Sequence, residues 1–588
     1  MNLSLIKEIC IEEKMIGHFS SFVLQQSFNA HHYFELRFNH DQIGAPGLIS
    51  LDDSRDYVGK TLTATFGYAM QNMQKFSGVV TKVELSQNNG YHGVIIVSGY
   101  SPTILIDRGP DLGSYLDKSL DDIIALATKD IPANDLKIVT NASRKKNIDY
   151  VIQYRESDFD FLNRLSAEYF EWFFYDGEYL HFGKPDEQKE IALVYGRDVS
   201  SLQYAMGVSP IKNKRFAYNP KQDEMLQGET AGTAEGRPDL VHAINASNSV
   251  YNKTFNQPSY IRVDNSEDIR NHVENQEKAN ISSLLKITAS GDNPEVTIGS
   301  VVDLTMSLQQ NLSFVTESLG KFLITSIMHT LDERGKYTNS FEGVVSTTER
   351  LTVRDYNRPN PDMQLADVVN NDDPQGQGRI KVKFKWSCQT NDVTEWLRVI
   401  TPDAGSSEKV NKNRGFVFIP EVGDQVAISF EEGNIARPIV MGSVFHGKNG
   451  TGGSSSNNSK SISSKSGHSF SMDDGAGILI SDKTKLNHIS VDGDKTITIT
   501  ADQKIVLQVT GGGSITIDGG DILLHGTNVK IIADEKFDTE SGKNTSITSC
   551  SADVNITAQG KLKGEGIGAV DVLSSGIIKV HGTEVDIN

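Results

Sequence analysis

The last part of the chain, residues 467–588, is the feature that most restricts the fold. It contains no Pro, Trp or Tyr, and its only aromatic residues are Phe470 and Phe537. A globular domain normally fills its core with large side chains, so this composition argues against one. Apolar residues recur two positions apart, which predicts short strands with one buried face. The pairs are Ile478/Ile480, Ile489/Val491, Ile497/Ile499, Ile505/Leu507, Ile515/Ile517, Ile522/Leu524, Val529/Ile531, Val554/Ile556, Val570/Val572, Ile578/Val580 and Val585/Ile587.

The spacing of these pairs limits how the strands can be covered. Two apolar side chains per strand leave the edges of a single ribbon open. A single-chain solenoid needs roughly 20 or more residues per coil. The pairs restart about every eight residues, which is too short for a coil. The pattern therefore favours a β-prism interwoven from several chains, three in our interpretation, over a single-chain β-solenoid.

Composition excludes several other classes of protein. The chain has 588 residues and a formal net charge of -19, which argues against nucleic acid or an anionic membrane as its main partner. Cys10, Cys388 and Cys550 are far apart, so neither a disulfide framework nor a metal site is expected. Charged residues interrupt the first twenty positions, so we expect no signal peptide. No apolar run approaches a spanning helix. These features predict a reduced, cytosolic origin.

The first hundred residues predict β-structure. Phe34, Leu36 and Phe38 alternate with polar residues, and two strands flank a hairpin signal at residues 88–90. His31, His32 and Glu35 resemble a metal cluster only superficially. Neighbouring residues of a strand point to opposite faces, so no metal is expected there.

The pattern becomes mixed from residue 101. Ser119 with Asp122 predicts a capped helix start, and Ser157 predicts a second one. The aromatic residues of 169–175 are interpreted as core rather than as a sugar or base platform. Residues 219–256 are rich in polar residues and glycine and are interpreted as loops, and residues 322–329 and 336–348 as a hairpin.

A small OB-type barrel is predicted after the polar spacer 370–378. Its five strands would be residues 379–386, 395–399, 415–424, 426–430 and 437–442. In the first of them Ile380, Val382, Phe384 and Trp386 face one way, and the lysines Lys381, Lys383 and Lys385 face the other. Bound single strands need basic and aromatic residues on one surface, so nucleic-acid binding is not expected.

Catalytic motifs are not recognisable in the sequence, so we expect no enzyme activity and no cofactor. It contains no Gly-x-Ser-x-Gly, His-Glu-x-x-His, P-loop or Cys-x-x-Cys pattern. Glu431 and Glu432 are interpreted as a charged turn rather than a carboxylate pair. His525 and His581 occupy matching turns, and three copies of one of them could hold an axial metal, although exposed turn histidines are commoner.

Several of these segments resemble one family. Residues 99–109, 154–165, and the ordered motifs Gly-Arg-Ile-Lys-Val-Lys-Phe (378–384), Ile-Pro-Glu-Val-Gly-Asp (419–424) and Arg-Pro-Ile-Val-Met-Gly (437–442) resemble VgrG proteins. These are trimeric spikes of the bacterial type VI secretion system, similar to the hub and cell-puncturing spike of contractile phage tails. Ser157-Asp158 stands where many relatives have Thr-Asp, and Tyr169-Phe170 where a glycine often follows the helix.

The resemblance implies a mainly β fold with a small α/β part. Its expected parts are a first hub-like β-barrel (1–100), an α/β subdomain (101–210), a second hub-like barrel with loops (211–369), an OB-fold domain (370–446), a flexible linker (447–466) and a trimeric β-helix needle (467–588).

The resemblance also implies partners and a mechanical role. The homotrimer would sit on a hexameric, Hcp-like tail-tube protein, contact baseplate components and carry effector toxins. A PAAR-repeat protein would dock at the tip, formed by Val580, Glu584, Val585, Asp586, Ile587 and Asn588. The chain would be cytoplasmic when assembled and then secreted or injected. Two alternatives stay open: the spike of a phage tail or extracellular contractile particle, and a β-helical polysaccharide-degrading tailspike enzyme.

Overall fold

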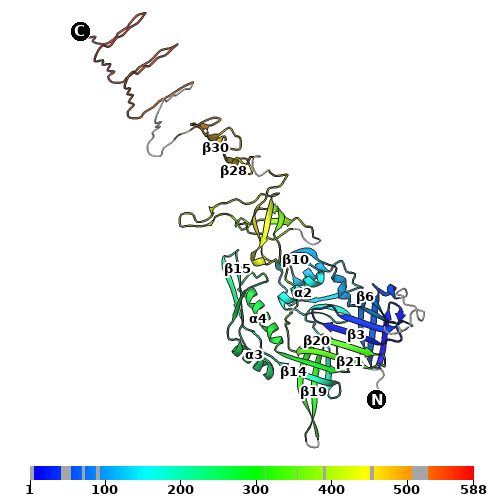
Figure 1. The fold of residues 1–588 in the computed structure, drawn as a ribbon. Coiled ribbons are helices and arrows are strands. Elements are labelled where there is room, and N and C mark those ends of the chain that lie inside the picture. The colour runs from blue at the N-terminus through cyan, green and yellow to red at the C-terminus, as the bar shows by residue number, and fades with distance from the viewer. Residues whose placement is uncertain are drawn as a thin grey trace. The chain divides into compact units, whose positions relative to one another are not determined.

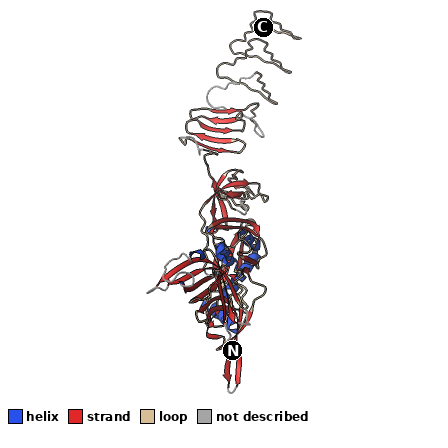
Figure 2. Ribbon diagram, turned by 90° about the vertical axis from the view of Figure 1, so that its right-hand side faces the viewer, coloured by secondary structure: helices blue, strands red, loops and turns tan. Residues whose placement is uncertain are grey.

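A computed structural model of the chain describes residues 5–40, 54–68, 73–87, 93–310, 313–353, 355–388, 393–450, 456–505, 507 and 527–587, the side chains of 307–310 and 313–315 excepted. The chain divides into two compact units, residues 1–500 and residues 501–588. The first unit is mainly β, with a few helices beside its sheets (Figures 1 and 2).

The strands of the first hundred residues form one half of a large sheet, in the order β20-β3-β4-β7-β6-β5-β1-β2. The predicted alternation is confirmed, because Phe34, Leu36 and Phe38 are fully buried. Strands β6 and β7 pair antiparallel as expected, and the turn signal at 88–90 lies outside the described residues. The strands are β1 (Leu5–Ile11), β2 (Lys14–Met15), β3 (Ser21–Ser27), β4 (Tyr33–Asn39), β5 (Thr61–Tyr68), β6 (Gln74–Gln87) and β7 (Gly93–Tyr100).

The other half of this sheet closes into a ring, because β19 pairs with both β13 and β20. Its members are β13 (Glu190–Tyr195), β14 (Val199–Met206), β18 (Leu285–Gly291), β19 (Val301–Gln310), β20 (Ser313–Asp332) and β21 (Tyr337–Val345). The predicted β20–β21 hairpin is confirmed. Strands β13 and β14 precede residue 211, so the second barrel starts earlier than predicted.

The long strand β20 joins the two halves. Its first part pairs with β19 of the ring, and its last part, residues 326–332, pairs with β3. Figure 1 shows β20 between β3 and β21. Because a single strand serves both halves, a boundary drawn between them along the sequence cannot separate two independent barrels.

The α/β part lies between residues 111 and 183. It contains β8 (Asp111–Lys118), α1 (Leu120–Ala127), β9 (Lys137–Asn141), β10 (Ile148–Glu156), α2 (Asp158–Tyr169), β11 (Phe173–Tyr175) and β12 (Tyr179–Gly183). Both helix starts were predicted correctly. Ser119 and Asp122 form a capping box, and the Ser157 hydroxyl accepts the backbone N–H of Asp160. The aromatic run is core, with Trp172 fully buried.

The interpretation of residues 219–256 as loops is wrong. This part contains β16 (Glu224–Glu229), α3 (Pro238–Val250) and β17 (Phe255–Pro258), and it is flanked by β15 (Asn213–Asn219) and α4 (Ser266–Ser282). Pro238 at the first turn favours a helix start, and Ala243 and Ile244 are buried. Only a narrow stripe of α3 is apolar, so its polar exposed face made the segment look like a loop.

The OB barrel begins at β22 (Gln364–Asn370), before the predicted boundary at 370. Its sheet has the order β23-β22-β26-β27, with β23 (Lys381–Phe384), β26 (Gln425–Phe430) and β27 (Pro438–Ser443). Leu397 and Val399 make isolated bridges only. Of the predicted strand 415–424, only Gly415 is in a strand, β25 (Arg414–Gly415), which pairs with β24 (Ala404–Gly405).

A five-stranded antiparallel sheet follows, made of β28 (Ser459–Ser463), β29 (Ser469–Asp473), β30 (Gly477–Ser481), β31 (His488–Val491) and β32 (Ile497–Thr500). The predicted strands at 478–480, 489–491 and 497–499 are confirmed. Strand β28 lies inside the stretch predicted as a flexible linker, which is therefore shorter. Neighbouring strands of this sheet pair within one chain, so this part is a meander rather than an interwoven ribbon.

The interwoven needle was expected over residues 467–588, and the second unit is the rest of that stretch. Its described residues, 501–505, 507 and 527–587, contain no assigned helix or strand, and large apolar side chains such as Ile531 and Val572 are exposed. The pairs at 515–517 and 522–524 lie outside the described residues. An interwoven prism requires strand partners from other chains, so this part of the fold stays a prediction.

Candidate functional site: a covered OB barrel and an uncovered apolar wall

The OB barrel shares its hydrophobic core with a ribbon of the α/β part. Strands β8 and β10 pair antiparallel, and Tyr150, Ile152 and Tyr154 of β10 belong to the same buried cluster as Val382 and Phe384. Ile152 is 1% exposed, and Phe384 is 3% exposed. Packing of this kind resists relative motion because interiors are as dense as organic crystals. The barrel is therefore fixed to the preceding region through its core.

Polar contacts reinforce this junction. Arg262, in the loop after β17, forms an ion pair with Glu395 of the barrel. The Asn434 side-chain amide donates to the carbonyl of Tyr260 at 3.1 Å, and Arg437 donates to the carbonyl of Ser259 at 3.2 Å. These contacts attach the barrel to the loop after β17 as well as to β10.

The polar spacer at 370–378 is an ordered turn of the OB barrel. The carboxylate of Asp373 accepts the backbone N–H groups of Gln375, Gln377 and Arg379, and it pairs with the Arg379 side chain at 2.7 Å. The hydrogen bond from the Arg379 guanidinium is the main cause that lowers the pKa of Asp373, and the backbone N–H groups add to it. The spacer therefore connects β22 to β23 instead of separating domains.

The sheet β28–β32 presents two rows of apolar side chains on one face, which we call the apolar wall. The first row is Ile462, Phe470, Ile480, Ile489 and Ile499, each paired with the next across neighbouring strands. The second row is Met472, Ile478, Val491 and Ile497, with Lys460 at its start. The opposite face carries mostly Ser and Thr, at positions such as Ser471, Ser490 and Thr498.

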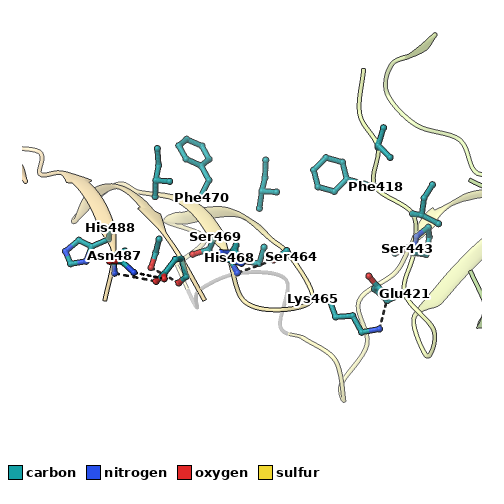
Figure 3. Close-up of a pocket in the computed structure, with 18 of the residues that line it drawn as sticks. Phe418, Glu421, Ser443, Ser464, Lys465, His468, Ser469, Phe470, Asn487 and His488 are labelled. Carbon is teal, nitrogen blue, oxygen red and sulfur yellow. Dashed lines mark hydrogen bonds and ion pairs between the residues drawn. The ribbon is translucent and has the colours of Figure 1, made fainter. Parts of the chain in front are cut away.

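The described part of its own chain leaves the apolar wall uncovered. Ile480 is 49% exposed and Ile499 is 50% exposed. A cavity of about 1370 Å³ opens over the first row, and Val417 and Phe418 from the loop after β25 and Phe445 from the segment after β27 also line it. Figure 3 shows the rings of Phe470 and Phe418 on the same side, with the Lys465–Glu421 ion pair (3.1 Å) turned away from them. A contiguous exposed apolar face of this kind marks an interaction surface.

Part of this surface was missed from the sequence. Phe418 was assigned to the predicted strand 415–424, but it lies outside any strand and is 58% exposed, and Phe445 is 71% exposed. Strand β28 was missed because only Ile462 among its residues is apolar. The alternation of Phe470 with Met472 in the next strand is the signal that could have extended the repeat towards it.

The predicted tip residues are described except for Asn588. Val580, Val585 and Ile587 are exposed, at 67%, 49% and 88%, and no described strand contains them. Glu584 and Asp586 are exposed as well. The structure of this single chain therefore does not test PAAR docking.

The histidines and carboxylates singled out in the sequence have ordinary partners. His31 contacts the Thr103 hydroxyl, whereas His32 is buried against Gln26, and burial lowers the pKa of His32 to about 3. Glu431 pairs with Arg398, and Glu432 with Arg437 at 3.7 Å, so these glutamates form a charged turn. His525 lies outside the described residues and His581 is exposed.

A metal site shared by three chains is not tested by one chain. The described residues contain no cluster of three or more His, Cys, Asp or Glu side chains suited to a metal ion. An axial His site would combine one residue from each chain, and it stays the less favoured alternative to exposed turn histidines.

Comparisons with known proteins agree with this architecture. The family model of the phage tail baseplate hub matches residues 49–335, and that of the type VI secretion system/phage-baseplate injector OB domain matches residues 364–445. The second match begins at the first residue of β22.

Curated relatives are similar to the chain at low identity. The type VI secretion system spike protein VgrG1c of Pseudomonas aeruginosa is 23% identical over 429 residues, which are 66% of this chain and 55% of the relative. The actin cross-linking toxin VgrG1 of Vibrio cholerae is 24% identical over 374 residues, 56% of this chain and 31% of the relative. The chain thus spans about half the length of the first relative and about a third of the length of the second.

A solved structure supports the fold. One chain of the lidless PdpA–VgrG complex matches with a TM-score of 0.54 at 10% identity, covering 85% of this chain and 98% of that one. A baseplate-hub region followed by an injector OB barrel defines the class of hub and spike proteins of contractile injection machines. Within this class the chain is similar to the VgrG spike proteins, as its motifs predicted.

Proposed function

We propose that the chain is the structural spike of a type VI-like contractile injection machine and acts as a homotrimer. The observation that carries this proposal is the apolar wall, which follows an OB barrel fixed firmly to a hub region. Three copies of the wall can bury their apolar faces against one another around an axis. The relatives named as spike proteins support the same role.

The mechanism is mechanical in this proposal. Force applied at the hub passes through the shared core of β8, β10 and the OB barrel, and then into the needle. The needle's narrow end is pushed through the target envelope, and effector toxins travel with it. One relative is named as an actin cross-linking toxin, but we assign no catalytic role to this chain.

The partners belong to the same proposal. The hub would contact a hexameric, Hcp-like tail-tube protein and baseplate components, and a PAAR-repeat protein would cover the tip. The spike would assemble in the cytoplasm and leave through the machine. In the described part of the chain, no helix has the length and apolar character of a membrane span.

The test of this function is secretion of the tube protein. In the bacterium that encodes the chain, deleting its gene should stop release of the tube protein into the medium, and the wild-type chain should restore it. Release that continues without the chain would contradict the proposal.

The tip is tested separately with the same strains. A variant lacking residues 577–588 should still form trimers but lose binding of the PAAR-repeat protein. Retained binding would place the docking surface elsewhere.

The family names also cover phage baseplates, so a phage-tail or extracellular particle spike remains the alternative. Neighbouring genes for a sheath with membrane-complex proteins would favour type VI secretion. Neighbouring genes for capsid or tail-fibre proteins would favour the alternative.

A further inference from the structure

A cavity of about 250 Å³ lies beside α2 and shares no lining residue with the cavity over the apolar wall. Its walls come from α2, from α4, from β15 and the loop after β17, and from Thr352, Val353, Tyr356 and Arg358, which precede the OB barrel. Arg215, Arg358, Tyr260, His272, Glu168 and Phe170 are among the residues that line it. Nothing in the proposed spike function uses this cavity.

Two guanidinium groups face the same aromatic ring in this cavity. Arg358 lies 3.7 Å from the centroid of the Tyr260 ring, and Arg215 lies 5.2 Å from it. Arg215 is 6% exposed. Burial lowers the pKa of Arg215, and the nearby charge of Arg358 acts in the same direction while Tyr260 opposes it. Arg215 is therefore a buried cation beside a second guanidinium, that of Arg358, which is exposed to solvent.

The hydrogen-bond partners of Arg215 are all neutral. It donates to Gln276 Oε1 at 3.0 Å, to Gln257 Oε1 at 2.9 Å and to the carbonyl of Pro258 at 3.1 Å. Within the described ranges, no carboxylate forms an ion pair with Arg215 or Arg358 at the 4.0 Å limit. A buried guanidinium normally has such a partner, because an uncompensated buried charge is costly.

The neighbouring acidic residues do not balance this charge. Glu168 is already engaged by Arg164 at 3.2 Å, and Arg164 also pairs with Glu156 at 2.6 Å. The guanidinium groups of Arg164, Arg215 and Arg358 thus have only two neighbouring carboxylates, those of Glu156 and Glu168. His272 adds no charge at neutral pH, because burial first and the charges of Arg215 and Arg144 next lower its pKa to about 3. The cavity has an excess of one positive charge.

A strained residue forms one wall of the cavity. Phe170, which ends α2, has φ 59° in the left-handed region. A bulky residue in this region is strained, and such strain is often found at ligand sites. The ring of Phe170 packs on His272 with 5.3 Å between centroids. A glycine would relieve the strain but would remove this wall.

We propose that this cavity binds one small oxyanion, a carboxylate or a phosphate group, between Arg215 and Arg358. Guanidinium groups present fixed pairs of N–H donors that match the oxygens of these anions. The volume suits a single such group rather than a nucleotide. The bound anion would supply the missing negative charge where α2, α4 and the segment leading to the OB barrel meet.

The direct test is calorimetric titration of the full-length protein. Inorganic phosphate and acetate are titrated separately in chloride buffer of matched ionic strength. We expect saturable binding of phosphate, and Arg358→Gln should weaken it by at least about ten-fold because one charge-assisted contact is lost. Arg334→Gln, in the exposed β20–β21 turn, makes the same charge change and should leave binding unchanged.

A second variant protects the test against misfolding. Arg215→Lys keeps the buried charge but removes the guanidinium fork, and it should weaken binding while the circular dichroism spectrum stays wild type. Binding of phosphate alone would identify a phosphate group as the ligand. Binding of acetate as well would identify a carboxylate, such as an acidic side chain of a partner. The proposal would be overturned if the phosphate titration gave no more heat than a chloride titration. It would also be overturned if Arg358→Gln bound phosphate as tightly as the wild type.

Discussion

Strand β23 of the OB barrel and strands β30–β32 of the apolar wall have the same alternation of apolar and polar residues, but their apolar faces differ in exposure. Ile380 and Val382 are fully buried, whereas Ile480 is 49% exposed and Ile489 is 40% exposed. The first face is covered by β10 from the same chain. Period-two alternation thus predicts that a face will be buried, but not which chain supplies the cover.

The OB barrel and the apolar wall have different sources of stability. The OB barrel is complete within one chain, so its stability belongs to that chain. In the proposed trimer the wall would gain stability on association, since leaving an apolar face in water forfeits about 25 cal/mol per Å² of the area that could be buried.

The largest effect is expected from charges placed on the wall. Ile480 and Ile489 are directly paired, and changing both to Asp would force carboxylates into the interface between chains. Ile480→Asp with Ile489→Asp should abolish the trimer in light scattering and leave the far-ultraviolet spectrum of the hub and OB regions intact. Ser490→Asp, on the polar face of the same strand, is the control and should stay trimeric. A trimeric double variant would show that the wall is not the interface.

The next effect is expected at the covered face. Ile152 is 1% exposed in the shared core, so Ile152→Ala should lower the free energy of unfolding by about 2–5 kcal/mol through lost burial and a cavity. Val139→Ala, at a residue 41% exposed on β9, should change it by less than about 0.5 kcal/mol. Denaturant unfolding measures both, and an unchanged midpoint for Ile152→Ala would mean that β10 does not stabilise the barrel.

A smaller effect depends on pH and belongs to the barrel alone. The folded-state pKa of Asp373 lies below its ordinary value of 3.8, so its contribution to stability is fully present above that value and is lost as the pH falls below it. The melting temperature of the wild type should therefore fall between about pH 5 and about pH 3 by more than that of Asp373→Asn. Asp372→Asn, at the exposed neighbouring residue, should follow the wild type. Equal pH dependence in Asp373→Asn and wild type would rule out this role.

The smallest effect is expected on the outer face of β23. Lys385 pairs with Asp367 at 2.6 Å and Lys381 lies 5.2 Å from the Trp396 ring centroid, while the aromatic Phe384 faces the core. Changing Lys381, Lys383 and Lys385 to Glu should not alter retention on a heparin column, because the acidic wild type should not bind it. Retention of the wild type that disappears in the variant would indicate a nucleic-acid-binding face.

Much of the architecture could be predicted because local patterns determined it. The capped helix starts at Ser119 and Ser157, the buried face of β23 and the strands of the wall follow from spacing and capping chemistry. The helices α3 and α4 could not be predicted, since their apolar stripes are narrow and most of their surface is polar. The sharing of β20 and the docking of β10 on the barrel depend on contacts between distant segments, which no local pattern contains.

The candidate site was predicted only in part for the same reason. The alternation around Ile480, Ile489 and Ile499 indicated a surface that needs a cover, but Phe418 was assigned to a strand of the OB barrel. Its exposure follows from the loop path after Gly415, which the sequence pattern did not indicate. Arg215 and Arg358 carried no signal, because their common aromatic partner lies far from both along the chain.

In the proposed trimer, two further copies of the chain cover the wall. Multi-angle light scattering of the purified full-length protein at low concentration measures the mass of the assembly. We expect a mass of three times 64.6 kDa that persists on dilution. A mass of 64.6 kDa at every concentration would contradict it and would make the tail a single-chain structure.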